Sequence, residues 1–339
     1  MMIRIGILGF GFMGNMHFNN YRKIDGVEIA AICDIDKDEF SGKSSSGNIT
    51  GSESDLDLSG IALYTDAEEM FTEQSLDIVS ITLPTYLHEE YAVKALHAGI
   101  NVLCEKPMAL DSMQCKRMIE ASKESGKLLQ IGHCIRFWPE YAEVKRIVES
   151  GQYGNVKAAS FRRLSLTPGW AWDNWILDEK RSGGAIHDLH IHDADYIQYL
   201  LGMPKAVFSS SAEGASGSFD HTVAQYVYED DIAVTAEGGW MMSHSFGFEM
   251  SFNIVLDEAV VCFDITRAES FRVCPQNSEA YSPVVDKADG YYLELEYFVK
   301  KVRGEDLPQI LTPVESMDSV RIVEAERLSS QNKQLVEIN

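Results

Sequence analysis

Three histidines and three aspartates stand within nine consecutive residues, 187–195. Two of them, Asp188 and His192, are four positions apart, so on a helix they share one face and can form a hydrogen bond. A histidine titrates near neutral pH and can take a proton from a hydroxyl group, while a carboxylate holds its ring in the required tautomer. The pair therefore predicts acid–base chemistry on an alcohol. The neighbouring His187 and His190 point to other sides of such a helix, and we expect their alanine variants to keep most activity.

The same segment fits two other interpretations. Histidines and aspartates at this density are typical of metal ligands, and polar residues along a helix are often a solvated face. Apolar residues interleave with the polar ones and give the helix a side to bury: Ile186, Leu189, Ile191 and Ala194. We favour the acid–base interpretation and assign no metal.

A second charged phrase, Glu105-Lys106-Pro107, follows the apolar run at residues 102–104. In open α/β sheets ligands bind beyond the carboxyl ends of the strands, so a lysine at this position points into a cleft. The alternative is a solvated lysine paired with Glu105, although a charged pair between a buried strand and a proline makes a poor surface turn. Lys106 is therefore a candidate to polarise a substrate oxygen.

Three glycines, Gly9, Gly11 and Gly14, have the spacing G-x-G-x-x-G directly after an apolar strand and before a helix. In a dinucleotide site the first permits a tight turn, the second lets the backbone approach a pyrophosphate, and the third packs helix against strand. The phosphates lie at the helix N-terminus, where unpaired N–H groups favour anions. The triplet alone is a weak signal, because glycines also serve simple turns, but its position between strand and helix predicts dinucleotide binding.

Asp34 ends the second predicted strand, 20 residues beyond Gly14, where its carboxylate is placed to accept both hydroxyls of a ribose. A 2′-phosphate would meet this carboxylate with no arginine directly after it, since Ile35 and Asp36 follow. The sequence therefore predicts NAD in preference to NADP.

Three tryptophans, Trp170, Trp172 and Trp175, stand beside the polar Asp173 and Asn174. Aromatic rings stack on the C–H faces of sugars, and polar neighbours can bond the hydroxyls. Core packing or an oligomer contact explains three tryptophans about equally well. We retain Trp172 and Trp175 as candidate substrate contacts.

The first part of the chain must position most of these residues. Short β-branched runs alternate there with amphipathic helical stretches, which predicts a Rossmann-type, doubly wound parallel sheet of the α/β class. The predicted strands are residues 3–8, 27–33, 78–82, 102–104 and 128–131. The predicted helices are residues 66–73, 89–98 and 112–125, with a further helix at 138–150. Residues 41–60 are rich in Ser, Gly and Asp, and we expect a surface loop there.

Beyond residues 151–154 the pattern changes to strands of differing length, which predicts an α+β domain with a mostly antiparallel sheet. Asp230-Asp231 and Asp257-Glu258 separate consecutive strands where hairpin turns would lie. The predicted strands are residues 156–163, 207–213, 222–228, 233–240, 249–256 and 260–265, and the predicted helices are residues 184–201, 292–302 and 314–330. The last helix opens with Thr312-Pro313-Val314-Glu315, a capping box with proline at the first helical position.

A chain of 339 residues is too long for one ordinary core. These patterns divide it into an NAD-binding domain at residues 1–135 and a substrate-binding and oligomerisation domain at residues 136–339. We expect the last helix, about residues 313–331, to pack back on the first domain.

Composition narrows the class of partner. The formal net charge is −23 with no basic stripe, and a nucleic-acid backbone would repel such a surface. No apolar run approaches the roughly 20 residues that cross a bilayer, and the first residues lack the features of a secretion signal. Six scattered cysteines, with no CxxC pair, indicate reduced thiols and neither a disulfide framework nor a zinc site. We expect a cytoplasmic protein that binds neither nucleic acid nor membrane.

Taken in order, these phrases resemble the glucose–fructose oxidoreductase / inositol dehydrogenase / MocA (Gfo/Idh/MocA) family of dehydrogenases acting on CH–OH groups. The resembling phrases are the G-x-G-x-x-G start, Leu83-Pro84-Thr85-Tyr86-Leu87-His88, Glu-Lys-Pro at 105–107, Gly132-His133-Cys134-Ile135-Arg136-Phe137, and G-G-x-x-x-D-x-x-x-H from Gly183. The resemblance covers nearly the whole chain, and the ordered set is specific although no single phrase is. The chain departs from its relatives at residues 41–60, where many of them carry a helix.

The resemblance implies roles for individual residues. Those that would hold the cofactor NAD are Gly9, Phe12, Met13 and Asp34, with Leu83, Pro84, Thr85 and His88 along its ribose and nicotinamide side and Glu105 and Lys106 beside the nicotinamide. Lys106, Asp188 and His192 would form the catalytic group and contact the substrate. Arg136 and Arg163 would be further substrate contacts.

The resemblance also implies reversible oxidation of a secondary alcohol on a sugar, inositol or related polyol. Two rival functions occur in such a family: NAD-using glycosidases that oxidise transiently, eliminate and reduce again, and sugar sensors that do not turn over. Sensors would be expected to lose the lysine or the histidine, and here Lys106 and His192 are both present.

The family's open antiparallel sheet commonly forms dimers or tetramers through its outer face. In this chain, residues 234–240 and 248–256 carry large apolar side chains that one layer of helices would leave partly uncovered. We therefore expect a homodimer or homotetramer.

Overall fold

The computed structural model describes residues 2–41 and 56–338 of the chain. The chain forms two compact units. The first consists of Met1–Cys134, Trp170–Trp175 and Asp289–Met317, and the second of Ile135–Gly169, Ile176–Ala288 and Asp318–Asn339. Most of the surface loop predicted at residues 41–60 lies outside the described residues.

The first unit is built on a six-stranded parallel sheet with the strand order β3-β2-β1-β4-β5-β6. Its strands are β1 (Ile3–Leu8), β2 (Val27–Cys33), β3 (Ala62–Tyr64), β4 (Ile78–Ile81), β5 (Asn101–Glu105) and β6 (Leu129–Gly132). The predicted doubly wound parallel sheet is thus confirmed. The sequence analysis missed β3, because three residues at the edge of a sheet carry too little periodicity to be recognised.

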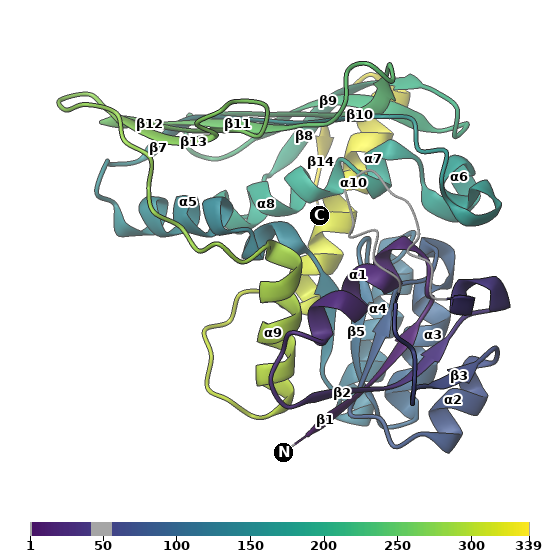
Figure 1. Cartoon of the computed structure of the whole chain (residues 1–339). Coiled ribbons are helices and arrows are strands. Elements are labelled where there is room, and N and C mark those ends of the chain that lie inside the picture. The colour runs from purple at the N-terminus through teal and green to yellow at the C-terminus, as the bar shows by residue number, and fades with distance from the viewer. Residues whose placement is uncertain (1, 42–55, 339) are drawn as a thin grey trace. The chain divides into compact units, whose positions relative to one another are not determined.

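Helices cover both faces of this sheet, which is why its strands read as continuous apolar runs. Figure 1 shows α1 (Phe12–Tyr21) and α9 (Gly290–Val302) on one side and α3 (His88–His97) and α4 (Ser112–Ser125) on the other. Shorter elements follow β2, β3 and β4: η1 (Lys37–Ser41), α2 (Ala67–Glu73) and η2 (Thr85–Leu87). One hydrophobic core joins β1 to α1 and α9, and includes Ile5, Ile7, Phe18, Leu295 and Phe298.

The C-terminal part of the chain returns to the first unit through α9 and the residues up to Met317. Of α10 (Pro313–Asn332), the residues up to Met317 belong to the first unit and those from Asp318 on belong to the second. The N-terminus of α10 forms the predicted capping box. Thr312 N donates to Glu315 Oε2 (2.7 Å), and Glu315 N donates to Thr312 Oγ1 (3.2 Å).

The second unit is built on an eight-stranded sheet with the order β13-β12-β11-β7-β10-β9-β8-β14. Only β7 and β10 pair in parallel, which confirms the predicted, mostly antiparallel sheet. Its strands are β7 (Val156–Leu166), β8 (Ala206–Glu213), β9 (Phe219–Val227), β10 (Ala233–Met242), β11 (Glu249–Leu256), β12 (Ala259–Asp264), β13 (Phe271–Pro275) and β14 (Val336–Glu337). The hairpins at Asp230-Asp231 and Asp257-Glu258 lie where the sequence predicts them, whereas β13 and β14 were missed.

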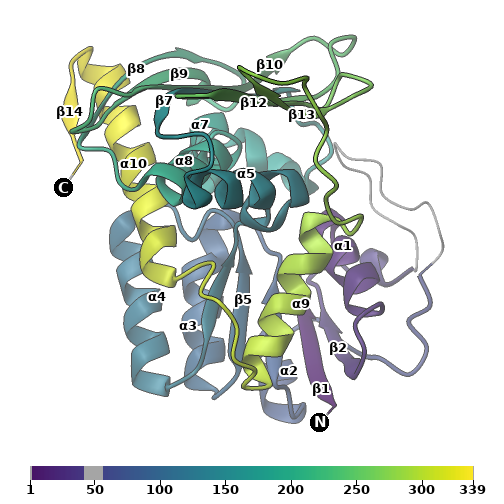
Figure 2. The ribbon, with the colours of Figure 1, turned by 90° about the vertical axis from the view of Figure 1, so that its left-hand side faces the viewer.

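Figure 2 shows α5 (Pro139–Ser150), α8 (Ile191–Leu201) and α10 on the same side of this sheet. The shorter elements between the longer ones in this part of the chain are η3 (Cys134–Phe137), η4 (Trp172–Leu177), α6 (Glu179–Ser182) and α7 (Ala185–Asp188). The large apolar residues that we expected to remain uncovered on β10 and β11 are instead buried, including Val234, Trp240, Met250, Phe252 and Ile254. Among the exposed apolar side chains of the sheet, Val255 lies within the segment 248–256 predicted to be partly uncovered, whereas Phe208, Val223, Val227 and Met241 lie outside the two segments so predicted.

The single helix predicted over residues 184–201 is wrong in detail, because the chain forms two helices there, α7 and α8. The backbone N–H groups of Leu189 and His190 both donate to the carbonyl of Ala185 at 2.9 Å, and the helical ladder is interrupted after them. Asp188 therefore ends one helix, while His192 lies in the first turn of the next. The simple four-residue spacing on one helix face does not apply to this pair.

Buried ion pairs anchor α8 to its surroundings. The Arg136 guanidinium donates to both carboxylate oxygens of Asp195 at 2.8 and 2.9 Å, and Ser319 Oγ of α10 donates to the same carboxylate at 2.7 Å. Arg163 of β7 binds Asp193 in the same bidentate manner at 2.9 and 3.0 Å. All four charged groups are buried, so each charge depends on its partner to offset the loss of hydration.

Substitution of Asp195 by alanine leaves the Arg136 guanidinium buried without its carboxylate. We expect Asp195→Ala to lower the free energy of unfolding of the second unit by about 3–5 kcal/mol in chemical denaturation. The matched control is Glu143→Ala, which removes the exposed pair between Glu143 and Arg146 (2.7 Å) and should change that free energy by less than about 1 kcal/mol. Equal effects of the two substitutions would contradict the anchoring of α8 by this pair.

Candidate functional site

The glycine-rich loop has the geometry that each of its glycines predicts. Gly9 has a φ of +91°, and a Cβ there would lie 2.8 Å from the carbonyl oxygen of Thr82. A Cβ on Gly14 would lie 2.1 Å from the carbonyl oxygen of Gly9, so only glycine lets α1 approach the end of β1 this closely. A Cβ on Gly11 would meet no atom within 4 Å. The backbone at Gly11 therefore faces open space at the N-terminus of α1, which suits a pyrophosphate.

Asp34 follows β2 and turns its carboxylate towards this loop. Oδ2 accepts the N–H of Phe10 (2.6 Å), and Oδ1 accepts the N–H of Asp36 (2.8 Å). Burial raises the pKa of the Asp34 carboxyl above its ordinary value, although both N–H groups oppose the shift. Each oxygen keeps a further lone pair that a ribose hydroxyl can use. The residues present therefore fit the dinucleotide that the motif predicts.

Two residues that the sequence analysis missed fix the shape of the loop. Asn15 Nδ2 donates to the carbonyl oxygens of Phe10 (2.6 Å) and Gly11 (3.0 Å). Thr82 Oγ1 donates to the carbonyl of Gly9 (2.6 Å) from the end of β4. A polar residue directly after the third glycine was a usable signal for Asn15, whereas Thr82 is close to the loop only because β4 pairs with β1.

The segment from Leu83 to His88 is tied to the residue after Lys106. The ring of His88 is buried, with Nδ1 2.8 Å from the carbonyl oxygen of Pro107 and Nε2 2.8 Å from that of Leu83. Burial lowers the pKa of His88, and a neutral ring donates to one of the two carbonyls at a time. The structure thus brings together two phrases that are separate in the sequence, on neighbouring strands of the sheet.

Glu105 ends β5 as a buried carboxylate rather than as one half of a solvated pair. Its Oε1 lies 2.9 Å from His17 Nε2, and its Oε2 accepts the backbone N–H of Lys106 (3.2 Å). Burial raises the pKa of this carboxyl, but the His17 bond and the charges of His17 and Lys106 outweigh burial and hold the pKa below its ordinary value. Gly132, paired with Glu105 on β6, leaves room for it, since a Cβ there would lie 3.0 Å from Oε1.

His17 lies on the buried side of α1 and was not predicted as a site residue. Its Nδ1 is 2.7 Å from Ser80 Oγ on β4, and Tyr21 OH donates to the same hydroxyl (3.3 Å). A chain of polar groups therefore runs from Tyr21 through Ser80, His17 and Glu105 to the backbone of Lys106. A histidine within the first helix was the available signal, but only the fold gives its partners.

The Gly183–Asp195 segment lies in the second unit, whereas Lys106 lies in the first. Burial separates its polar side chains into two groups. His187, His190, Asp193 and Asp195 are at most 2% exposed, while Asp188 and His192 remain partly accessible. Asp188 and His192, the predicted acid–base pair, therefore remain partly accessible to solvent.

Polar side chains from other elements bind the backbone of Gly183 and the start of α7. Arg327 of α10 donates to the carbonyl of Gly183 and to Ser218 Oγ (2.9 Å), and Ser218 Oγ donates to the same carbonyl (3.1 Å). Asp220, which is fully buried, accepts the N–H of Ala185 at the start of α7 (3.4 Å). These residues from β9, its preceding turn and α10 were not predicted from the sequence, because they lie 30 or more positions away.

The remaining predicted substrate contacts differ in accessibility. Arg136 and Arg163 are 1% and 3% exposed, and both are paired with aspartates within the second unit. Each guanidinium group is therefore already bound by a buried carboxylate. Trp172 is 49% exposed, and Trp170 and Trp175 are partly buried. The positive φ angles of Asp173 (49°) and Asn174 (47°) mark a tight turn between Trp172 and Trp175.

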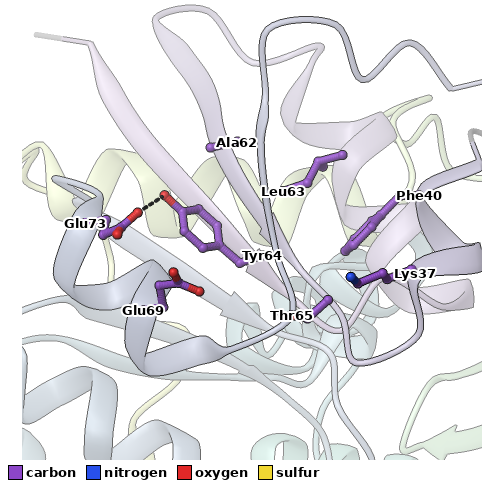
Figure 3. Close-up of a pocket in the computed structure, with 8 residues that line it drawn as sticks. All are labelled: Lys37, Phe40, Ala62, Leu63, Tyr64, Thr65, Glu69 and Glu73. Atoms are coloured by element: carbon purple, nitrogen blue, oxygen red, sulfur yellow. Dashed lines mark hydrogen bonds between the residues drawn. The ribbon is translucent and has the colours of Figure 1, made fainter.

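The first unit also contains an open cavity of about 540 Å³ beside the edge strand β3 (Figure 3). Its lining residues are Lys37, Phe40, Ala62, Leu63, Tyr64, Thr65, Glu69 and Glu73. Figure 3 shows Tyr64 OH bonded to Glu73 Oε2, a distance of 3.2 Å. None of the residues predicted to carry chemistry lines this cavity, so it does not locate the reaction.

Within residues 2–41 and 56–338, no group of three or more His, Cys, Asp or Glu side chains is arranged to hold a metal ion. The dense segment at 187–195 instead distributes its charges, with Asp193 and Asp195 facing different arginines. In the same part of the chain, no helix combines the length and hydrophobicity needed to cross a membrane.

Comparison with known families covers both units. Residues 3–133 match the oxidoreductase family with an NAD-binding Rossmann fold, and residues 141–261 match the GFO/IDH/MocA C-terminal domain. The predicted family and the predicted NAD-binding domain are thus confirmed.

Two curated proteins are similar in sequence to this chain. The chain is 27% identical over 227 residues to a 2,7-anhydro-N-acetylneuraminate hydratase of Mediterraneibacter gnavus (67% of this chain, 55% of the relative). It is 30% identical over 205 residues to inositol 2-dehydrogenase of Salmonella typhimurium (59% and 55%). The chain thus spans about half the length of these curated relatives.

A crystal structure of the WlbA dehydrogenase from Bordetella pertussis, with NADH and UDP-GlcNAcA, has the same fold. Its TM-score is 0.83 at 20% sequence identity, over 100% of this chain and 98% of that one. With both units matched by models of one family, the chain belongs to the glucose–fructose oxidoreductase / inositol dehydrogenase / MocA family of NAD-binding oxidoreductases.

Proposed function

We propose that this protein is an NAD-dependent dehydrogenase that transfers hydride between nicotinamide and a secondary alcohol of a sugar, inositol or related polyol. The observation that carries the proposal is the sorting of polar side chains between residues 187 and 195. Four of them are buried, while Asp188 and His192 keep the access that an acid–base pair needs. Membership of an oxidoreductase family and similarity to an inositol 2-dehydrogenase support the same chemistry.

In this proposal each residue has one task. His192 takes the proton of the substrate hydroxyl, Asp188 orients the ring of His192, and Lys106 polarises the substrate oxygen. Bound NAD would supply a nicotinamide ring that accepts the hydride at C4. The residues that would hold it are Gly9, Gly11, Phe12, Met13 and Gly14 at the pyrophosphate, Asp34 at the ribose, and Leu83, Pro84, Thr85, His88 and Glu105 towards the nicotinamide. Trp172 and Trp175 are retained as substrate contacts.

A second candidate function is a lyase or hydrolase reaction that uses NAD transiently. The similarity to a 2,7-anhydro-N-acetylneuraminate hydratase favours it, because a hydratase reaction involves no net oxidation. An NADH-formation screen over sugars, sugar acids and inositols separates the two functions. A dehydrogenase accumulates NADH in proportion to product, whereas the second candidate converts substrate without net NADH.

Substitution of the catalytic group should separate an enzyme from a sugar sensor. We expect His192→Ala and Lys106→Met each to reduce turnover by about 10²- to 10⁴-fold while NAD binding persists, because an acid–base or polarising group is lost. The control is His244→Ala, an exposed histidine after β10, which should keep turnover within about twofold. Steady-state kinetics and NAD titration by fluorescence give both quantities, and unchanged turnover in His192→Ala would refute the assignment.

The cofactor preference should depend on Asp34. We expect NAD to bind at least about tenfold more tightly than NADP, because the carboxylate repels a 2′-phosphate, and we expect Asp34→Ala to narrow this difference. Calorimetric titration of both dinucleotides measures it, with the exposed Asp38→Ala as the control. Equal affinities in the unsubstituted protein would mean that the carboxylate does not face the ribose.

We also propose a cytoplasmic homodimer or homotetramer that associates through the sheet of the second unit. The six cysteines, four of them buried, suit a reducing compartment. Phe208, Val223 and Val227 are exposed, and the antiparallel register of β8 and β9 puts them on one face of the sheet.

Light scattering at micromolar concentration tests this association. We expect a mass of two or four times the 37.9 kDa of one chain, and a smaller mass for Val223→Asp, because a charge on this face opposes burial. Val284→Asp, at a fully exposed position of a loop, is the control. A monomeric mass for the unsubstituted protein would contradict the proposal.

A further inference from the structure

The break between α7 and α8 is built around a buried histidine. His190 is fully buried, and its Nε2 lies 3.2 Å from Oε2 of Glu326, which is also fully buried on α10. Burial lowers the pKa of His190, but the Glu326 carboxylate outweighs burial and raises this pKa above its ordinary value, so the two groups form an ion pair. The burial of His190 changes our expectation that its substitution leaves activity in place.

Glu326 is itself held from two strands of the sheet. Its Oε1 accepts the hydroxyl of Tyr226 on β9 at 2.7 Å, and its backbone carbonyl accepts Ser209 Oγ on β8. Burial raises the pKa of Tyr226 well above its ordinary value, so its hydroxyl stays protonated and remains a donor. The carboxylate that meets His190 is therefore fixed by elements outside the segment that carries Asp188 and His192.

The sheet leaves room for the imidazole ring at one position. A Cβ on Gly238 of β10 would lie 2.5 Å from His190 Nδ1 and 2.9 Å from His190 Cβ. Because no side chain at position 238 fits beside this ring, the glycine and the histidine are complementary. The ring thus lies against the backbone of β10, between the sheet and α10.

The backbone of His190 forms hydrogen bonds with both helices. Its N–H donates to the carbonyl of Ala185, the first residue of α7, at 2.9 Å. Its own carbonyl accepts the N–H groups of Asp193 (3.0 Å) and Ala194 (3.2 Å) in the first turn of α8. A displacement of His190 consequently moves the end of α7, where Asp188 lies, together with the start of α8, where His192 lies.

We propose that His190, held by Glu326, is a positioning residue that sets Asp188 and His192 in register with each other across the break between α7 and α8. This inference rests on the proposed function, because it gives those two residues their acid–base roles. His190 itself is fully buried and touches no reacting atom. It acts through the backbone that it shares with both helices.

The charged groups around His190 come from several elements. They are Glu326 of α10, Asp193 of α8 and Arg163 of β7, with Tyr226 of β9 behind Glu326. Asp193 and Arg163 neutralise each other in their own bidentate pair. A substitution of Glu326 should therefore act on the predicted catalytic pair from a distance, through the contact with His190.

A double-mutant cycle on His190→Gln and Glu326→Gln tests the proposal. Glu326→Gln keeps the size of the side chain and lies more than a hundred positions from His192. We expect either single substitution to lower kcat by about 10- to 100-fold, with the affinity for NAD within about twofold, because a small displacement of acid–base groups slows the chemical step. In the His190→Gln background, Glu326→Gln should change kcat by less than about twofold, since the contact is already lost.

The cycle has a readout that does not require turnover. The titration of the His192 ring, followed by NMR of histidine-labelled protein, should change with Glu326→Gln in the wild-type background but not in the His190→Gln background. A through-space effect of the carboxylate would be the same in both backgrounds and would overturn the proposal, as would an unchanged His192 titration in all variants. Thermal melts identify the folded variants. If His190→Gln alone does not fold, His190→Asn takes its place in the cycle.

The matched control is a second histidine–glutamate pair, which lies on the sheet of the same unit. His221 Nε2 lies 3.1 Å from Glu237 Oε1, and both side chains are partly exposed. Glu237→Gln should leave kcat and the His192 titration unchanged. Turnover is measured with myo-inositol and with the best substrate of the NADH-formation screen. If no sugar or polyol yields NADH, the proposed function fails, while the His192 titration still decides whether His190 positions it.

Discussion

A charge removed from water needs a partner, and this constraint organises the second unit around α8. Three buried pairs hold the segment that begins at the α7–α8 break: His190 with Glu326, Asp193 with Arg163, and Asp195 with Arg136. Their partners come from α10, β7 and η3. Because breaking such a pair leaves an uncompensated buried charge, the segment has little freedom to shift. These pairs bury His190, Asp193 and Asp195 but leave Asp188 and His192 accessible. Residues with structural roles and residues with chemical roles therefore lie within a few positions of each other.

The first unit applies the same constraint at the ends of parallel strands. Asp34 and Glu105 are carboxylates at the carboxyl ends of β2 and β5, and each is satisfied by backbone N–H groups or by His17. Helices cover both faces of the sheet, so polar groups can emerge only at such an edge. The edge is therefore where Asp34 meets the glycine-rich loop and where Glu105 fixes the backbone of Lys106.

Glycine allows close approach between elements at three points in this molecule. Gly14 lets α1 approach the carbonyl of Gly9, Gly132 accommodates the carboxylate of Glu105, and Gly238 accommodates the ring of His190. The first of these can be recognised from a motif. The other two cannot, because the partner of each lies on a different element, 27 and 48 positions away in the sequence.

Local patterns were sufficient to determine the parallel and antiparallel sheets, the glycine-rich loop with Asp34, and the capping box at Thr312. Each of these depends on residues that are adjacent or regularly spaced, so periodicity and spacing carry the information. The short edge strand β3 and the break at Leu189 and His190 were not predictable in this way. The break follows from the position of the His190 ring between Gly238 and Glu326. This position depends on the packing of α10 against the sheet. The sequence by itself thus determined which residue types could do chemistry and in which family of folds. Only the tertiary structure decided which of the six polar residues between 187 and 195 are buried as structural charges and which stay accessible, because burial and charge pairing are properties of contacts between distant segments.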